Sequence, residues 1–212
     1  MPEPKDETTA TNTKKRYGML IDLSLCVGCN ACVVACKLEN DTPLGKFNTW
    51  VESWDAGVYP QVARANLPKL CNHCADAPCV DACPYEATFA DEAGIVVVDK
   101  EKCIGCGTCV SICPYGARYV DKEAQKCGKC TYCYGRSTNG LLPVCVASCI
   151  THARVFGDLD DPHSDIAQAV AAGSPLALRA ELGFDTATRY LLLEETLEAP
   201  VCSEVFRGGY EK

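Results

Sequence analysis

The stretch Cys103-Ile-Gly-Cys106-Gly-Thr-Cys109-Val-Ser-Ile-Cys113-Pro114 decides how the chain folds. Its spacing, C-x2-C-x2-C-x3-C-P, is typical of iron–sulfur proteins, in which three closely spaced cysteines bind one cluster and the fourth binds a neighbouring cluster. Gly105 and Gly107 suit this role, because a loop around a cluster turns sharply and glycine has no Cβ to obstruct the approach. The stretch therefore predicts cysteine-ligated clusters arranged in pairs.

The same spacing occurs near the N-terminus, in Cys26-Val-Gly-Cys29-Asn-Ala-Cys32-Val-Val-Ala-Cys36. We call this stretch motif one and the stretch above motif three. In each, an aspartate, Asp22 or Asp99, stands four residues before the first cysteine. Such self-similarity indicates an internal repeat of one structural unit. Motif one departs from motif three in having Lys37 at the position of Pro114.

Motif two lies between them and reads Cys71-Asn-His-Cys74-Ala-Asp-Ala-Pro-Cys79-Val-Asp-Ala-Cys83-Pro84. Its middle gap is longer, but the final C-x3-C-P spacing is restored. We predict that His73 is a hydrogen-bond donor near a cluster and not a ligand, since four cysteines already suffice.

The fourth set of cysteines is irregular and allows two assignments. Cys127 with Cys130 would leave fourteen residues before Cys145, whereas Cys130 with Cys133 would leave eleven. Cys149 closes the set in either case. We favour the second assignment because it resembles the pattern of a family described below. It leaves two spare thiols, Cys127 and Cys202.

The composition excludes several classes of protein. The chain has 212 residues with 18 cysteines, a net charge of −8 and only 8% aromatic residues. The negative charge argues against nucleic-acid binding, which needs a basic face. The sequence contains no apolar run long enough to span a membrane. Residues 1–16 are polar and lack the apolar region of a signal peptide, so we predict a disordered N-terminal arm.

Other uses of so many cysteines fit less well. Structural zinc sites usually pair two C-x2-C elements across a longer gap, and disulfide frameworks belong to small secreted chains. The three histidines, His73, His152 and His163, are scattered, and the sequence has neither a phosphate loop nor a dinucleotide fingerprint. We therefore predict that the chain carries out one-electron transfer and has no catalytic residues.

Local patterns predict few regular elements outside the motifs. Residues 38–68 are expected to form a loop, in which Trp50 and Trp54 cover the clusters from water. In the tail, a serine-capped helix is expected over 164–171 and a second helix over 174–183. Alternation and turn residues predict a hairpin and short strands, at 87–98, 17–22, 117–120, 155–158 and 188–193.

With four such motifs in this order, the chain resembles the four-cluster ferredoxin-type subunits of the dimethyl-sulfoxide-reductase family of molybdenum oxidoreductases. The resemblance covers residues 17–159, and relatives of this kind serve polysulfide, thiosulfate, tetrathionate, arsenate, nitrite and dimethyl-sulfoxide reductases. Some relatives replace a cysteine of motif three with tryptophan, but this chain keeps Cys106, so four [4Fe–4S] clusters are implied. The chain departs from the pattern at Ile150, where relatives often have proline. The other stretches that carry the resemblance are Cys113-Pro-Tyr-Gly116, Cys130-Thr-Tyr-Cys133 and Phe156-Gly-Asp-Leu-Asp-Asp161.

The family's pairing of motifs implies the ligands of each cluster, three cysteines from one motif and the last from its partner. Cluster one is expected to be bound by Cys26, Cys29, Cys32 and Cys149. Cluster two is expected to be bound by Cys71, Cys74, Cys79 and Cys113. Cluster three is expected to be bound by Cys103, Cys106, Cys109 and Cys83. Cluster four is expected to be bound by Cys130, Cys133, Cys145 and Cys36.

The fold that the resemblance implies is α+β, with two bacterial-ferredoxin-like lobes, short strands and helices, many loops and a C-terminal extension. Lobe one comprises residues 17–65 and 121–159, and lobe two is inserted as residues 66–120. Residues 160–212 are expected to form a docking tail. The implied partner is a large molybdopterin catalytic subunit, and a membrane-anchor subunit that exchanges electrons with quinol is a further candidate.

Two other functions compete with that of a complex subunit. One is a free multi-cluster ferredoxin that shuttles electrons, although the long segment after motif one and the tail exceed what a compact shuttle needs. The other is a redox sensor that uses Cys127 and Cys202, which would require exposed thiols with thiolate character. The family also implies a location: the subunit folds in the cytoplasm and is exported, bound to its partner, to the outer face of the membrane. The alternative is that the complex stays in the cytoplasm.

Overall fold

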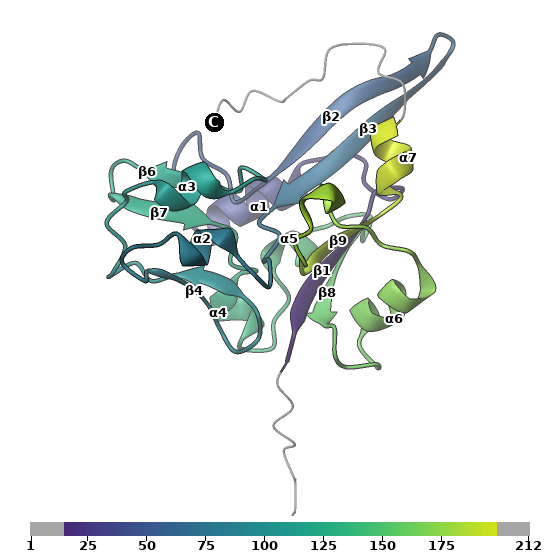
Figure 1. Cartoon of the computed structure of the whole chain (residues 1–212). Helices are drawn as coiled ribbons and strands as arrows, with labels where there is room; N and C mark the ends of the chain where they lie inside the picture. The colour runs from purple at the N-terminus through teal and green to yellow at the C-terminus, as the bar shows by residue number, and fades with distance from the viewer. Residues whose placement is uncertain (1–14, 199–212) are drawn as a thin grey trace, which may run out of the picture.

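The computed structural model describes residues 15–198 of the chain. Short strands and helices follow one another throughout this part, and no barrel forms in it (Figure 1), so the predicted α+β class is confirmed. In chain order the elements are β1 (Tyr17–Asp22), α1 (Ala31–Glu39), β2 (Thr49–Val58), β3 (Gln61–Leu70), α2 (Pro78–Asp81), β4 (Thr88–Ala90), β5 (Val96–Val98), α3 (Thr108–Ile112), β6 (Arg118–Asp121), β7 (Lys126–Lys129), α4 (Tyr134–Ser137), α5 (Val144–Ala147), β8 (Arg154–Asp158), α6 (Asp165–Ala172), η1 (Ala180–Leu182), β9 (Thr188–Leu191) and α7 (Leu193–Glu198).

The central sheet joins three segments that are far apart in the sequence. β1 lies in the middle, antiparallel to β8 and parallel to β9. Successive residues 18–21 are all buried, so both faces of this strand are covered, and Met19 and Ile21 belong to the main hydrophobic core. The strands predicted at 17–22, 155–158 and 188–193 are therefore confirmed, although the last of them ends at Leu191.

The longest element contradicts the sequence prediction. β2 and β3 form an antiparallel hairpin, paired from Thr49 opposite Leu70 to Val58 opposite Gln61, and its tip projects from the body of the molecule (Figure 1). The loop predicted over 38–68 is thus wrong for most of its length. Its prolines suggested a loop, but each strand of a two-stranded ribbon is an edge strand, where proline is tolerated.

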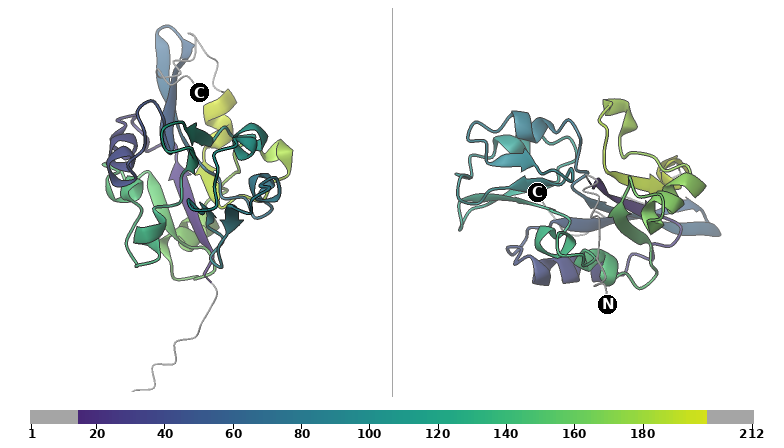
Figure 2. Two further views of the ribbon diagram at one scale, coloured as in Figure 1. Left: turned by 90° about the vertical axis from the view of Figure 1, so that its left-hand side faces the viewer. Right: turned by 90° about the horizontal axis from the view of Figure 1, so that it is seen from below.

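Two small hairpins and two short helices form the part of the chain around motifs two and three, and the second hairpin runs past residue 120, the predicted end of lobe two. β4 pairs with β5, as predicted for residues 87–98. β6 confirms the strand predicted at 117–120, whereas its partner β7 was not predicted. Helices α2 and α3 begin inside motifs two and three and contact each other. These segments gather in one half of the molecule, and Figure 2 shows the same grouping from two further directions.

The C-terminal part is more closely integrated than a tail would be. Ser164 Oγ accepts a hydrogen bond from Ala167 N at 3.1 Å and caps α6, which confirms the first predicted helix. The second predicted helix is wrong, because only the turn η1 forms and Leu176 instead pairs with Tyr190. Since β9 belongs to the central sheet and Tyr190 is fully buried, residues up to 191 are part of the folded body. Their role in docking stays a prediction.

Most of the predicted N-terminal arm, residues 1–16, lies outside the described residues. Cys202 lies outside them as well. Arg16, at the end of this arm, forms an ion pair with Asp160, with 2.9 Å between Nε and Oδ1. In residues 15–198 no helix has the length and apolar character needed to cross a membrane.

Candidate iron–sulfur cluster sites

Four cysteines of lobe two surround one cavity. They come from the loop after β3, from α2 and from the end of α3. Side chains of Asn72, Tyr115 and Arg118 complete the wall. The fold thus brings together the set that the resemblance assigns to cluster two, namely Cys71, Cys74, Cys79 and Cys113.

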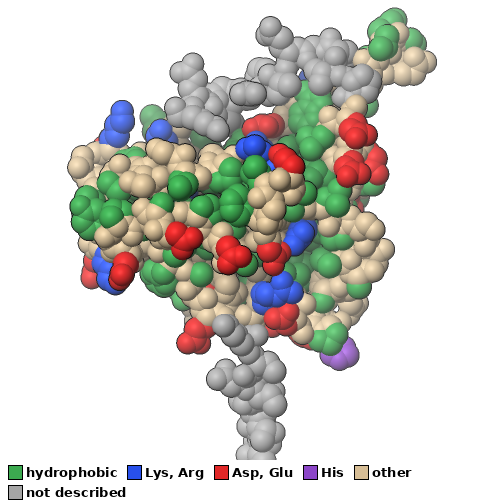
Figure 3. Space-filling model, viewed as in Figure 1, with side chains coloured by type: hydrophobic (Ala, Val, Ile, Leu, Met, Phe, Trp, Pro, Cys, Tyr) green, Lys and Arg blue, Asp and Glu red, His purple; other side chains and the backbone are tan. Residues whose placement is uncertain are grey.

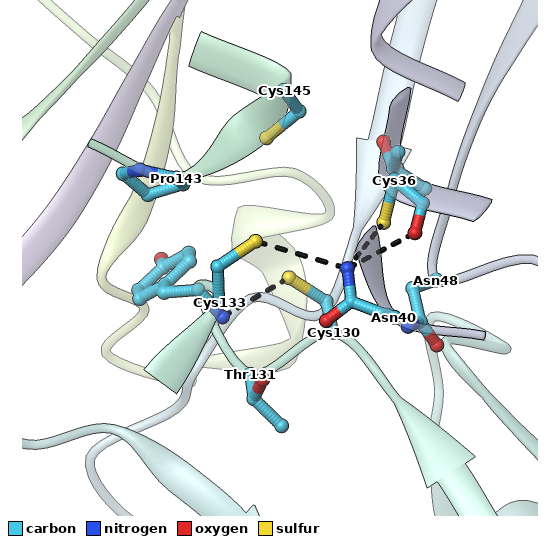
Figure 4. Close-up of a pocket in the computed structure, with 10 residues that line it drawn as sticks. Cys36, Asn40, Asn48, Cys130, Thr131, Cys133, Pro143 and Cys145 are labelled. Carbon is cyan, nitrogen blue, oxygen red and sulfur yellow. Dashed lines mark hydrogen bonds between the residues drawn. The ribbon is translucent and has the colours of Figure 1, made fainter. Parts of the chain in front are cut away.

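A second cavity lies in lobe one between the end of α1 and the loop after β7. The sulfur atoms of its four cysteines face one another across it (Figure 4). The Asn40 side chain approaches two of them, with Nδ2 3.5 Å from Cys36 Sγ and 3.8 Å from Cys133 Sγ. Cys127 does not line this cavity, and the lining cysteines are those predicted for cluster four, namely Cys36, Cys130, Cys133 and Cys145.

The set predicted for cluster one lies where motif one meets the segment before β8. Cys26 interacts electrostatically with Cys32 and Cys149, so the first and last segments of lobe one are adjacent there. Asn66 of β3 donates from Nδ2 to the Cys26 carbonyl oxygen at 3.0 Å, so the long hairpin fixes this loop. Cys29 is exposed at the surface.

The set predicted for cluster three gathers around α3. Cys103 and Cys109 are buried in one hydrophobic cluster, Cys83 packs against it, and Cys106 is exposed. Cys127 also lies here, and its backbone N–H donates to Cys103 Sγ at 3.3 Å. Burial, reinforced by Cys109, raises the pKa of the Cys127 thiol to about 12. A buried thiol that resists ionisation is unlike a sensor cysteine, so the site gives no support to the redox-sensor alternative.

All four motifs share one feature of backbone geometry. The residue before the second cysteine is left-handed in each, with φ of 68°, 45°, 72° and 51° at Gly28, His73, Gly105 and Tyr132. Such a residue turns the loop sharply. At Gly28 and Gly105 the space is also closed, because a Cβ would lie 2.5 Å from Asn66 Oδ1 and 2.6 Å from Gln125 O. The repeat inferred from the cysteine spacing therefore extends to the loop conformation.

Two of the thiols that line the cavities need a nearby positive charge to ionise. Burial, and then the neighbouring Cys145 and Cys133, raise the pKa of Cys36 to about 12. Burial and the other three cysteines of its set likewise raise the pKa of Cys74 to about 12. The thiolate is the form that binds a metal, so bound iron would supply the charge that holds these side chains ionised.

A further observation tests whether a cluster fits these cavities. Asn72 is buried in the wall of one cavity, and neither Nδ2 nor Oδ1 has a partner in this part of the chain. Buried polar groups are normally paired, and a cluster sulfur is an acceptor that Nδ2 could reach. The residues present therefore fit the cofactor.

Sequence reasoning missed three buried basic residues beside the cysteines: Arg118 in β6, Lys129 in β7 and Arg154 in β8. Nη2 of Arg118 lies 3.1 Å from Cys79 Sγ, and Nη2 of Arg154 lies 3.6 Å from Cys32 Sγ. The sequence did contain a signal for the arginines. Each stands five residues after the last cysteine of its motif, in Cys113-Pro-Tyr-Gly-Ala-Arg118 and in Cys149-Ile-Thr-His-Ala-Arg154.

Comparison with known proteins agrees with this chemistry. Residues 62–159 match the 4Fe-4S dicluster domain, and residues 23–43 match a 4Fe-4S binding domain. The chain is 45% identical over 192 residues to a tetrathionate reductase subunit of Salmonella typhimurium, covering 89% of this chain and 77% of the relative. It is 37% identical over 203 residues to a sulfite dehydrogenase subunit of Allochromatium vinosum, covering 85% of each.

A third relative, the arsenate respiratory reductase iron-sulfur subunit ArrB of Shewanella sp. strain ANA-3, is 34% identical over 216 residues, covering 79% of this chain and 92% of the relative. The identity extends over most of each chain, so it includes the segments between the cysteine motifs as well as the motifs themselves. The cofactors are therefore [4Fe–4S] clusters, and the chain belongs to the iron–sulfur electron-transfer subunits of the dimethyl-sulfoxide-reductase family of molybdopterin oxidoreductases.

Proposed function

We propose that this subunit carries electrons through four [4Fe–4S] clusters, one in each cysteine set described above, between a molybdopterin catalytic subunit and a second redox partner. A [4Fe–4S] cluster, when bound, accepts and releases a single electron. The role of the protein chain is to hold the four cysteine sets at fixed positions and to shield sets two and four from water. No residue of this chain is assigned a catalytic role.

Interactions between the sets support a linear order of clusters, and this observation carries the proposal. Within lobe one, Cys145 of the fourth set interacts electrostatically with Cys32 of the first. Between the lobes, Cys130 of the fourth set interacts with Cys71 of the second. Sets two and three share motifs within lobe two. These interactions support the order three, two, four, one, in which we propose that each electron hop is between neighbouring sets.

The two ends of this series are the places where the cysteines reach the surface. Cys29 of set one and Cys106 of set three are exposed, whereas the sets between them are more buried. Beside them, the equivalent residues Val27 and Ile104 are 60% and 50% exposed. Hydrophobic side chains are also visible between charged ones on the lobe-two surface in Figure 3. Exposed apolar residues next to a terminal cluster support contact with a partner at each end.

The relatives are named as subunits of a tetrathionate reductase, a sulfite dehydrogenase and an arsenate respiratory reductase, so a catalytic partner is implied for this chain. We extend this to a molybdopterin partner at one end and a quinol-linked membrane subunit at the other. We also propose that the complex is exported after folding, because a chain wrapped around clusters cannot be threaded through a pore.

Anaerobic co-expression with a catalytic subunit from the neighbouring gene tests the proposal. We expect a stable complex in which this chain holds about sixteen iron and sixteen sulfide, four per cluster, and in which reduced clusters are reoxidised when the substrate of the partner is added. A reproducible value near half that iron, or stoichiometric zinc, would contradict the cluster count. Recovery of this chain only as a free monomer would favour the ferredoxin shuttle instead.

A further inference from the structure

We propose that three buried basic side chains, Arg118, Lys129 and Arg154, occupy the three gaps between successive clusters and raise the reduction potentials of the clusters on either side. This inference rests on the ligand sets and the order proposed above. It assigns to these residues a role in setting the potentials along the series, which is a property of the chain and not of its partners.

Arg118 lies between sets two and three. Its Nη2 is 3.1 Å from Cys79 Sγ of set two, and Nη1 donates to Thr88 Oγ1 at 3.2 Å, which fixes the plane of the guanidinium. The guanidinium also interacts with Cys109 of set three. Only 5% of the residue is exposed, so water screens this charge poorly.

Arg154 repeats this arrangement in lobe one. Its Nη2 is 3.6 Å from Cys32 Sγ of set one and 3.0 Å from Thr49 Oγ1, and the guanidinium interacts with Cys145 of set four. The residue is 4% exposed. In both lobes, therefore, a buried arginine approaches the third cysteine of one motif and is oriented by a threonine hydroxyl.

Lys129 occupies the junction between the lobes. Its Nζ donates to the backbone carbonyl oxygens of Val96 and Cys130, which ties lobe two to the start of set four. It interacts electrostatically with Cys71 of set two as well as with Cys130. The residue is 4% exposed, and burial lowers the pKa of its ammonium group, whereas the neighbouring Cys71 and Cys130 favour the charged form.

The counter-charges of these residues are the cysteines themselves. None of the three forms an ion pair with a carboxylate in residues 15–198, where every ion pair found involves other residues. A buried charge without a partner is costly, and a cluster with four thiolates is anionic. A cluster gains further negative charge when it is reduced, so a nearby fixed cation stabilises the reduced form more than the oxidised form.

The internal repeat makes this arrangement more than a coincidence of packing. Arg118 and Arg154 stand at the same distance from the end of their motifs, on equivalent strands β6 and β8. At the same point of motif two the chain has Thr88, which is the hydroxyl partner of Arg118. One arginine per lobe is thus built into the repeat at the position facing both sets.

Redox titration of the complete complex, followed by EPR, tests the inference. The variants are Arg118→Gln and Arg154→Gln, which remove the charge, and Arg118→Lys and Arg154→Lys, which keep it but withdraw it from the sulfur. We expect each Gln variant to lower the midpoint potentials of the two flanking clusters, and each Lys variant to lie between Gln and the native protein. Lys129→Met should lower those of clusters two and four. Arg189→Gln is the control. It changes the net charge equally, but Arg189 bonds Asp185 and not a cysteine, so this variant should leave all four midpoint potentials unchanged.

The native protein and the variants are compared at equal iron content, which separates the two levels of the argument. If the native complex lacks four clusters, the proposed function fails. If it holds four clusters and the Gln variants show unchanged potentials, only the present inference is overturned. If a Gln variant does not assemble, the matching Lys variant is measured instead. Unchanged midpoint potentials in that Lys variant, at full iron content, also overturn the present inference.

Discussion

His73 stacks on Tyr132, with 3.7 Å between the ring centroids and 25° between the planes. Both are buried, and both hold the left-handed position that glycine fills in motifs one and three. His73 belongs to motif two and Tyr132 to motif four, so a single aromatic contact joins the two lobes where sets two and four meet. The strain of a left-handed residue, about 1–2 kcal/mol, is thus offset by packing that glycine could not provide.

The protonation of this pair follows from its contacts. His73 Nδ1 accepts a hydrogen bond from Val96 N at 3.0 Å, so its proton is on Nε2. Burial, and then the charges of Lys129 and Arg118, lower the pKa of His73 well below its usual range. The imidazole is therefore neutral, and Nε2–H remains available as the donor that we predicted from sequence.

Truncation of the stacked ring should weaken the junction between the lobes. Tyr132→Ala is expected to cost about 3–5 kcal/mol, because it empties a fully buried site. Tyr132→Phe is expected to cost about 1 kcal/mol, since it removes only the hydrogen bond of 2.6 Å to Thr188 Oγ1. The measurement is the temperature at which cluster absorbance is lost. Tyr59→Ala at the exposed hairpin tip serves as control, and an equal fall for Tyr59→Ala would contradict the prediction.

The register of motif four can be tested with two cysteine variants. Cys127→Ser should keep all four clusters, because four other cysteines are available to set three and Cys127 does not line the cavity of set four. Cys133→Ser should lose or convert one cluster, because Cys133 lines the cavity of set four. Iron analysis and EPR decide between these outcomes. If the two variants behave the other way round, our register is wrong by three residues.

Removal of iron should unfold most of the chain. Cysteines such as Cys32, Cys71 and Cys130 belong to the main hydrophobic core, so loss of a cluster leaves that core with a cavity and with unpaired buried thiols. Metal binding in such domains is itself folding free energy. We expect apo-protein prepared with chelator and acid to show narrow NMR dispersion and no cooperative melt. Native-like dispersion in the apo form would show that side chains alone maintain the core.

The sequence predicted the chemistry of the site better than its framework. The geometry of the cluster sets the cysteine spacing, so the spacing can be recognised in the sequence before the fold is known. Two of the four predicted sets line cavities in the structure. The arginines were missed because a lone arginine in a strand is usually a surface residue. Only the alignment of Arg118 with Arg154 in the repeat distinguishes them.

The framework was harder because it depends on long-range pairing. The β2–β3 hairpin is stabilised by its own strand pairing and by contacts of Asn66 with motif one. No local sequence pattern predicts these contacts. Likewise the strand at 188–191 was predicted, but its pairing with β1, about 170 residues away in sequence, was not. Deletion of residues 160–212 would therefore remove a strand of the central sheet. A deletion limited to residues 199–212 is the better test of a docking tail.

The left-handed glycines give the sharpest test of the loop geometry, because the chain offers matched positions with and without open space. Gly105→Ala should be the most damaging, since its Cβ would lie 2.6 Å from the backbone oxygen of Gln125, which cannot move alone. Gly28→Ala should be milder, because it meets the side chain of Asn66. Gly94→Ala has φ of 78° but no atom within 4 Å, so it should show only the conformational cost, about 1–2 kcal/mol. Iron retention during incubation with chelator ranks the three variants. Equal loss from all three would mean that backbone conformation alone, and not close approach to the loop, requires glycine in the cluster-binding motifs.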